Sequence, residues 1–374
     1  MAEKQNTPEI RFEGFTDPWE QRKLGELCTI SKGHGYSKAD IRDGGTPLIL
    51  YGRLYTQYES RIENVDTFAV EQEGSLLSKG NEVIVPASGE TAEDIAVASS
   101  VRRSGIIFGG DLNVVTPASR LDPDYTALAI TYSKAHDDLA RRAQGKSVVH
   151  VHGNDIAEVE ISYPSESEQK RISTTVLALD NLITLHQRKY DKLCTVKKSM
   201  LDKMFPKPGE TEPEIRFEGF TDPWEQRKLG ELASIKTGDS DLRDAAPDGR
   251  YPFFVRSDKV ERSNRYLYDG EAILVPGEGR LGEIFHYVNG KFDYHQRVYK
   301  ISDFNGVTAK FVVYSMMRDF KKHALQNTAK ATVDSIRLPT LTEFQFSLPK
   351  PEEQKKIGQY FSQIDSLITL HQRA

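Results

Sequence analysis

Apolar residues recur at steps of three and four along residues 165–205, a stretch without glycine or proline. Ser165 and Glu168 have the spacing of a capping box, so this stretch is expected to begin as a helix. A single apolar stripe on a helix of about 40 residues, roughly 60 Å long, is typical of a coiled coil. The stripe consists of Ile172, Val176, Leu179, Ile183 and His186.

A second helix with the same kind of stripe is predicted after Pro351. The sequence LITLHQR occurs in both stretches, at residues 182–188 and 367–373. Because the two stripes are alike, we expect the helices to pair with each other in antiparallel orientation. The alternative interpretation is a plain bundle helix inside one large core. The second stripe consists of Ile357, Phe361, Ile364, Ile368 and His371.

Other parts of the chain are also present twice. The sequence PEIRFEGFTDPWEQRKLGEL at residues 8–27 returns unchanged at residues 213–232, and EQKRI at 168–172 is matched by EQKKI at 353–357. Solenoid repeats have periods of about 20–50 residues, so this longer spacing predicts a duplicated domain. Within the shared opening, Asp17 is expected to cap a short helix.

Short apolar runs closed by proline lie between the shared segments and predict buried strands, as in GNEVIVP at residues 80–86 and GEAILVP at residues 270–276. The expected fold class is therefore α+β, with two similar mixed α/β domains joined by long helices that form an antiparallel coiled coil with an internal pseudo-twofold axis. The expected boundaries are 1–164 for the first domain, 165–205 for the central helix, 206–349 for the second domain and 350–374 for a short distal helix.

Composition narrows the class of protein. The chain has 374 residues, which is enough for two domains with separate cores. Its two cysteines predict neither a disulfide framework nor a zinc site, and it lacks the run of about 20 apolar residues that would cross a bilayer. A reducing cytoplasm is therefore the expected location, without membrane contact. The formal net charge of −5 argues against coating of nucleic acid by bulk electrostatics, although it permits a local basic groove.

Catalytic motifs are incomplete in the sequence. The letters GKS at residues 145–147 match the end of a phosphate-binding loop, but the glycine required five residues earlier is replaced by Ala140. The sequence has no serine-nucleophile elbow and no acidic pair in a nuclease-like pattern. His186 and His371 are interpreted as packed helix residues and not as metal ligands. We therefore expect a binding protein without catalytic residues, metal or cofactor of its own.

The chain closely resembles the specificity subunit of type I restriction-modification enzymes in four features. These are the repeated opening, the step from a strand through proline into EQK[RK]I, the LITLHQR stripe and the head-to-tail duplication. The resemblance covers essentially the whole chain. It implies two target recognition domains, each reading one half of a split double-stranded DNA sequence, held apart by long conserved helices. It also implies partners: methyltransferase subunits, normally two, which transfer a methyl group from S-adenosylmethionine to adenine, and restriction subunits that translocate and cut DNA.

The stretch KYDKLCTVKKSMLDKMF, which follows the first LITLHQR at residues 189–205, departs from the duplication because the second copy has no counterpart to it. Half of the first helix is therefore expected to lack a mate. Two other functions stay open. One is an interaction protein that captures methyltransferase subunits through its helices without reading DNA. The other, less favoured, is a nuclease in its own right.

Residues that read DNA bases are expected among arginine, lysine, asparagine and glutamine, since the first two suit guanine and the others adenine. Two polar clusters lie just before the strand that is expected to end each domain, and further arginines lie near other predicted strands. Any one of these residues could instead be a solvated surface charge. The candidates are Arg53, Arg141, Arg142, Gln144, Lys146 and Ser147 in the first domain, and Arg256, Arg280, Arg297, Lys321, Lys322, Gln326, Asn327 and Lys330 in the second.

Overall fold

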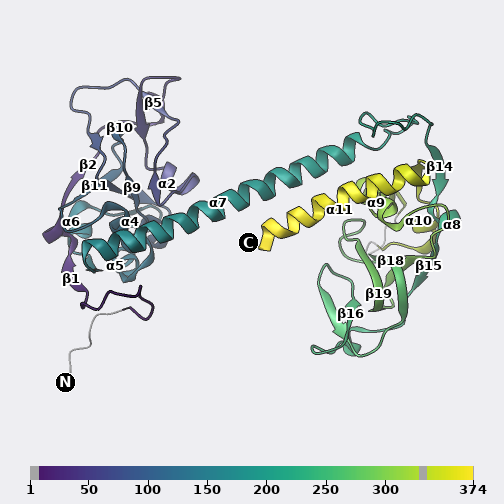
Figure 1. Cartoon of the computed structure of the whole chain (residues 1–374). Coiled ribbons are helices and arrows are strands. Elements are labelled where there is room, and N and C mark those ends of the chain that lie inside the picture. Colours follow the sequence, from purple (N-terminus) through teal and green to yellow (C-terminus); the bar gives the residue numbers. More distant parts are fainter. Residues whose placement is uncertain (1–7, 328–334, 374) are drawn as a thin grey trace. The chain divides into compact units, whose positions relative to one another are not determined.

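A computed structural model describes residues 8–327 and 335–373 of the chain. Its backbone contacts divide the chain into two compact units, residues 1–184 (unit 1) and 185–374 (unit 2). Each unit combines strands with helices, which confirms the α+β class (Figure 1). Within the described residues, no helix is long and apolar enough to span a membrane.

Unit 1 contains two main sheets and two short strand pairs. Its strands are β1 (Glu20–Lys23), β2 (Cys28–Lys32), β3 (Thr46–Ile49), β4 (Arg61–Ile62), β5 (Phe68–Ala69), β6 (Leu77–Lys79), β7 (Glu82–Pro86), β8 (Ser88–Gly89), β9 (Ser99–Val101), β10 (Ser104–Phe108), β11 (Leu112–Pro117), β12 (Val149–His150) and β13 (Glu160–Tyr163). The five-stranded sheet has the order β2-β11-β7-β9-β4 and the four-stranded sheet the order β5-β3-β10-β6, while β1 pairs with β13 and β8 with β12.

The helices of unit 1 are mostly short. They are α1 (Leu24–Leu27), the 3-10 helix η1 (Lys38–Asp40), α2 (Arg53–Thr56), α3 (Ala92–Ile95), α4 (Pro123–Tyr132), α5 (Lys134–Arg142) and α6 (Gly153–Ala157). The long helix α7 (Glu166–Lys203) begins in unit 1 and ends in unit 2. These bounds agree with the helix expected at residues 165–205, because its apolar periodicity is a local signal.

Unit 2 is built around one six-stranded sheet in the order β15-β20-β18-β19-β16-β17, with β14 and β21 as a separate pair. These strands are β14 (Glu225–Lys228), β15 (Ser234–Thr237), β16 (Tyr251–Phe254), β17 (Val260–Ser263), β18 (Tyr268–Pro276), β19 (His286–Tyr294), β20 (Val298–Ser302) and β21 (Gln345–Leu348). The helices are α8 (Leu229–Leu232), η2 (Leu242–Asp244), α9 (Ala309–Asn327), α10 (Leu338–Thr342) and α11 (Pro351–Arg373).

The proline-closed strands β7 and β18 are buried on both faces. In β7, Val85 packs into the main core of unit 1, whereas its neighbour Ile84 packs into a second cluster. In β18, Ile273 packs into the main core of unit 2 and Leu274 into a second cluster. Because successive side chains of a strand point to opposite faces, a strand buried on both sides has the continuous apolar run that the sequence contains.

A buried glutamine anchors the first turn of each long helix. The side chain of Gln354 is fully buried; its Oε1 accepts a hydrogen bond from the N–H of Thr308 at 3.0 Å, and its Nε2 donates to the carbonyls of Gly306 and Pro349 at 3.2 and 2.8 Å. Gln169 makes the same three kinds of contact in unit 1. The repeated EQK sequence therefore has a structural role.

The residue before each glutamine forms a buried ion pair with the shared opening. Glu168 is paired with Arg11 and Glu353 with Arg216, at 2.7 and 2.8 Å, and both carboxylates are almost fully buried. The hydrogen bond with Glu353 raises the pKa of Arg216 and outweighs the opposing effect of burial. These pairs explain why the opening and the EQK sequence recur together in both copies.

The prediction of a short helix capped by Asp17 is wrong. The four residues from Glu20 form strand β1, which pairs antiparallel with β13 so that Glu20 lies opposite Tyr163. In unit 2 the same letters form β14, with Glu225 opposite Leu348. The pairing partner lies more than a hundred residues away in the sequence, so a local capping pattern does not reveal it.

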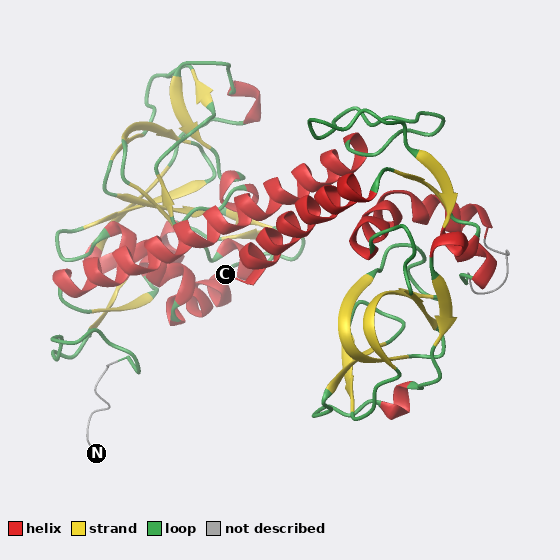
Figure 2. Cartoon of the chain, turned by 45° about the vertical axis from the view of Figure 1, so that its right-hand side comes forward, coloured by secondary structure: helices red, strands yellow, loops and turns green. Residues whose placement is uncertain are grey.

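Within unit 2, the second half of α7 runs antiparallel to α11, in agreement with the expected coiled coil (Figure 2). The Nδ1 atoms of His186 and His371 lie 3.0 Å apart, and further along α7 the Nζ of Lys197 lies 2.6 Å from a carboxylate oxygen of Asp365. The two histidines occupy equivalent positions in the two sequence copies, so a local twofold axis relates the helices at this point. The other stripe residues differ in burial: Ile357, Phe361 and Ile364 are buried, Ile172, Val176 and Ile368 are half-buried, and Leu179 and Ile183 are exposed.

Candidate nucleic-acid interface

Four loops of unit 2 converge around the carboxylate of Glu278, which follows β18. The N–H of Gly277 donates to the carbonyl of Arg297 at 2.9 Å, and the N–H of Ile336 donates to the carbonyl of Gly277 at 2.8 Å. The loop after β16 joins them because the N–H of His295 donates to the carbonyl of the last β16 residue at 2.9 Å. Backbone hydrogen bonds therefore fix the positions of the side chains that these loops carry.

Glu278 holds two arginines. Its carboxylate accepts a hydrogen bond from Nη1 of Arg256 at 3.1 Å and another from Nη1 of Arg297. Burial raises the pKa of Glu278, but the hydrogen bonds from the two guanidinium groups outweigh this effect and hold the pKa below its ordinary value. The arginine side chains are 48% and 54% exposed, so further N–H donors remain accessible. In the same loop, Arg280 pairs with Asp258 at 2.7 Å.

Unit 1 has different chemistry at the equivalent strand end. Ser88 follows β7 as Glu278 follows β18, and each forms a β-bridge with the segment before the closing strand, Ser88 with His150 and Glu278 with Ser335. The Oγ of Ser88 lies 3.2 Å from Nδ1 of His150, and the hydroxyl of Tyr55 donates to the carbonyl of Ser88 at 2.7 Å. Hydroxyl and imidazole groups therefore replace the arginine and carboxylate cluster.

Three predicted DNA-reading residues of unit 1 lie beside this position. Gln144, Lys146 and Ser147 are exposed in the turn that leads into β12, and Gln144 exchanges two backbone hydrogen bonds with His150, at 3.0 and 2.8 Å. Gly145 has a φ of +137°, and a Cβ at this position would lie 2.0 Å from a backbone oxygen. Glycine is therefore required for the turn that presents these three side chains.

Several other predicted residues are paired with acids of their own unit. Both Arg141 and Arg142 contact Asp138, and Arg142 also donates to the carbonyl of Glu158 at 3.2 Å. The Arg141 side chain remains 74% exposed. In unit 2, the predicted residues at α9 are exposed, and one of them, Lys321, pairs with Glu283 at 2.6 Å; the others are Lys322, Gln326 and Asn327. Lys330 lies outside the described residues.

Arg53 has a structural position instead. Its side chain is only 11% exposed, and its guanidinium donates to carboxylate oxygens of Glu59 and Asp66 at 2.8 and 3.0 Å and to the carbonyl of Asn64 at 2.9 Å. These contacts tie the turn after β3 to the following loop. The guanidinium is committed to unit 1 itself, so we leave Arg53 out of the proposed interface.

Replacing Arg53 by alanine is expected to lower the free energy of unfolding of unit 1 by about 1–3 kcal/mol, because its acceptors lose a charged donor. Chemical denaturation in a Trp224→Phe background, in which Trp19 is the only tryptophan, measures this change by fluorescence. Arg141→Ala is the matched control, and we expect it to leave stability unchanged. A loss of DNA affinity in Arg53→Ala without a loss of stability would return Arg53 to the interface.

Sequence reasoning missed the carboxylate and hydroxyl that organise the two positions. Glu278 and Ser88 each stand two residues after the proline that closes a repeated strand. This shared spacing is a signal in the sequence. Residue type alone does not mark these two positions, because an acidic or small residue is not itself expected to bind DNA, whereas here Glu278 orients two arginines that can.

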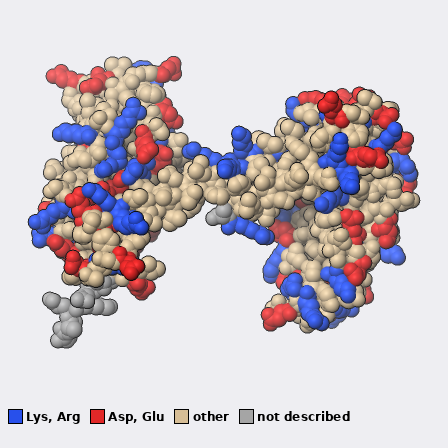
Figure 3. Space-filling model, viewed as in Figure 1, with Lys and Arg blue, Asp and Glu red and all other residues tan. Residues whose placement is uncertain are grey.

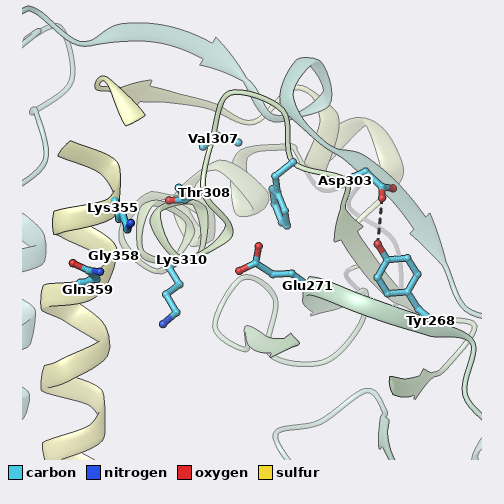
Figure 4. A pocket seen from close by; sticks show the side chains of 10 residues that line it. Tyr268, Glu271, Asp303, Val307, Thr308, Lys310, Lys355, Gly358 and Gln359 are labelled. Carbon is cyan, nitrogen blue, oxygen red and sulfur yellow. Dashed lines mark hydrogen bonds between the residues drawn. The ribbon is translucent and has the colours of Figure 1, made fainter. Parts of the chain in front are cut away.

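A separate hollow of about 550 Å³ lies in unit 2. Figure 4 shows Tyr268 and Glu271 on β18 and Lys355 on α11, with the Tyr268 hydroxyl donating to Asp303 at 3.2 Å. The polar groups form no arrangement of nucleophile, base and orienting acid. Across residues 8–327 and 335–373, no group of three or more His, Cys, Asp or Glu side chains could hold a metal ion.

Basic and acidic side chains are mixed on the surface of both units. Figure 3 shows lysine and arginine side chains interspersed with aspartate and glutamate over the visible face of each unit. A mixed surface does not attract DNA over a wide area, because opposite charges compensate each other. Any DNA contact would therefore depend on the orientation of particular side chains, such as those held by Glu278.

Comparisons with known proteins agree with a duplicated architecture. The chain matches the family described as "Type I restriction modification DNA specificity domain" over residues 16–194 and 221–374. It is 33% identical over 145 residues to the type I restriction enzyme EcoDI specificity subunit of Escherichia coli, a match that covers 39% of this chain and 31% of that protein. The matched part is thus less than a third of the length of the E. coli relative.

Two further similarities extend over nearly the whole chain. The type I restriction enzyme MjaVIII specificity subunit of Methanocaldococcus jannaschii is 21% identical, with 99% of this chain and 91% of that protein covered. The crystal structure of a type I restriction-modification system S subunit from M. genitalium has a TM-score of 0.72 at 14% identity, covering 98% of this chain and 94% of that one. The latter similarity concerns the fold.

Proposed function

Because the chain belongs to the family of type I restriction modification DNA specificity domains, we propose that it selects the DNA target of a type I restriction-modification complex. Each unit reads one part of a split sequence through the loops that converge beside the end of its proline-closed strand. The catalytic steps take place on other subunits, so this chain supplies recognition and a scaffold.

The different chemistry of the two equivalent loops carries this proposal. Arg256 and Arg297 have half-exposed guanidinium groups, which suit bidentate hydrogen bonds to O6 and N7 of guanine. Unit 1 instead offers Gln144, a residue type that suits adenine, close to Ser88 and His150. Two identical readers related by a twofold axis would fit a palindrome. Two unlike readers in one chain fit a target with unlike halves.

Methyltransferase subunits, two in number, are the proposed first partners, with S-adenosylmethionine bound to them and restriction subunits joining the same assembly. The net charge of −5 supports a need for partners, because counterion release from phosphates requires basic groups that this chain has only locally. We place this assembly in the cytoplasm, where it has access to double-stranded DNA.

Methylation mapping tests the proposed function. The chain is expressed with a candidate methyltransferase subunit in a host that lacks adenine methylation, and the genome is then sequenced for methyladenine. We expect a split motif, with two short defined halves around a fixed gap. If a stable complex forms and no new methylation follows, the result contradicts target selection and favours the interaction protein that captures methyltransferase subunits without reading DNA.

Variants of unit 2 should change only one half of that motif. The double substitution Arg256→Ala and Arg297→Ala is expected to relax base choice in one half by about tenfold or more, because each lost bidentate contact costs about 1–3 kcal/mol of discrimination. Lys259→Ala is the matched control, because it removes an exposed basic side chain of the same unit and should leave base choice unchanged. Loss of specificity in both halves together would argue against separate readers.

A further inference from the structure

In unit 2, Phe205, the second residue after the end of α7, occupies an aromatic cage. The Phe205 ring is 3% exposed, and its centroid lies 5.9 Å from the Trp224 ring, 5.5 Å from Phe311 and 6.1 Å from Phe361. Arg318 closes the cage, because its guanidinium carbon lies 5.9 Å from the Phe205 centroid and its Nη1 donates to the carbonyl of the next residue at 2.8 Å. The end of α7 is thereby fixed to unit 2.

The duplicated anchors identify the same positions in unit 1. The backbone N–H groups of Asp122 and Thr308 donate equivalent hydrogen bonds to the buried glutamines, so these two residues correspond. Counting onward from them, each residue of α4 corresponds to the residue of α9 that lies the same number of positions further along. The four cage residues correspond to Trp19, Tyr125, Val176 and Tyr132. All four line one hollow of about 910 Å³ in unit 1, and the Tyr132 side chain is 63% exposed.

The helix stripe that leads to this hollow also differs between the units. Ile364 of α11 is 7% exposed where it faces α7, whereas its counterpart in unit 1, Leu179, is 54% exposed. Ile183 is 64% exposed, while its counterpart Ile368 is half-buried and packs against the core of unit 2. Unit 1 therefore has a continuous apolar surface, from Ile183 and Leu179 through Val176 into the hollow, which we call the unit 1 groove.

Charges beside the unit 1 groove match those used in unit 2. There, Lys197 pairs with Asp365 at 2.6 Å and Lys203 with Glu214 at 2.8 Å. The counterparts of these acids in unit 1 are Asp180 and Glu9, by the same sequence repeats. A lysine-rich helix that followed the unit 1 stripe would therefore meet an acid at both positions.

We propose that the unit 1 groove binds an amphipathic, lysine-rich helix ending in Met-Phe-Pro, with the sequence character of residues 189–206. The phenylalanine enters the hollow and packs against Trp19 and Tyr125, which contact each other edge to face, and the apolar side of the helix covers Leu179 and Ile183. This site concerns protein assembly and is independent of DNA reading, so it goes beyond the function proposed above.

A peptide with the sequence of residues 189–206 and an N-terminal fluorophore tests the site by anisotropy, with the full chain as titrant. We expect saturable binding, at least about tenfold weaker for a peptide carrying Phe205→Asp, because a buried aromatic anchor dominates such contacts. In the chain, Tyr132→Glu should weaken binding comparably, whereas Lys321→Glu in unit 2 should not.

Tyr132 is largely exposed, so Tyr132→Glu is expected to leave the fold intact, which circular dichroism checks. Absence of saturable binding, or equal binding of the two peptides, overturns the proposal. Equal effects of Tyr132→Glu and Lys321→Glu would overturn it as well, because binding would then be electrostatic and unrelated to the groove. None of these results depends on DNA, so failure here is distinguishable from failure of the proposed recognition function.

Discussion

Leucine in place of Gln354 is expected to lower the free energy of unfolding of unit 2 by about 3–5 kcal/mol, because it leaves three buried backbone groups without their partner. These groups are the N–H of Thr308 and the carbonyls of Gly306 and Pro349. Leucine has a similar volume, so the loss measures hydrogen bonding more than packing. Denaturant unfolding in a Trp19→Phe background, in which Trp224 is the only tryptophan, gives the stability of unit 2.

The duplication provides the matched control for this prediction. Gln169→Leu should destabilise unit 1 by a similar amount and leave the Trp224 transition unchanged, since Gln169 makes the equivalent contacts there. Lys355→Ala, the exposed neighbour of Gln354, should have little effect. A loss below about 1 kcal/mol in Gln354→Leu would show that water replaces the side chain as a partner, and that the glutamine is not a structural anchor.

The elements that could be predicted from sequence are those whose signal is local. Helix α7 was expected at residues 165–205 and spans Glu166–Lys203, because its periodicity and capping residues lie within the helix itself. The buried strands β7 and β18 were identifiable from continuous apolar runs. Strand β1 could not be identified in this way, because its conformation depends on pairing with β13, which lies far away in the sequence. Such tertiary contacts override local capping preferences.

The candidate interface was only partly predictable for a related reason. Residue type drew attention to Arg256 and Arg297, but residue type does not reveal which acids lie nearby in space. Arg53 has the same side chain and is held by Glu59 and Asp66 inside unit 1. The distinction between an arginine that is oriented yet accessible and one that is buried in a loop depends on contacts between distant segments.

Alanine in place of Phe205 is expected to lower the free energy of unfolding of unit 2 by about 3–5 kcal/mol, the usual cost of removing a fully packed aromatic ring. The ring contacts Trp224, Phe311 and Phe361, so its loss leaves a cavity that these large side chains cannot easily fill. The Trp224 fluorescence transition in the Trp19→Phe background measures the change.

Leu185→Ala is the control for the Phe205 substitution, because Leu185 lies on α7 itself with a half-exposed side chain and its loss should cost far less. The end of α7 should also lose protection in Phe205→Ala: hydrogen exchange of the residues near Met204 is expected to accelerate, whereas exchange in the first turn of α7 is not. A loss of stability below about 1 kcal/mol, with unchanged exchange at Met204, would mean that the cage does not hold the helix end. The Phe205 ring would then contribute little to the stability of unit 2. In that case the similarity between the cage and the unit 1 groove would give no reason to expect the phenylalanine of a bound helix to stabilise binding in unit 1.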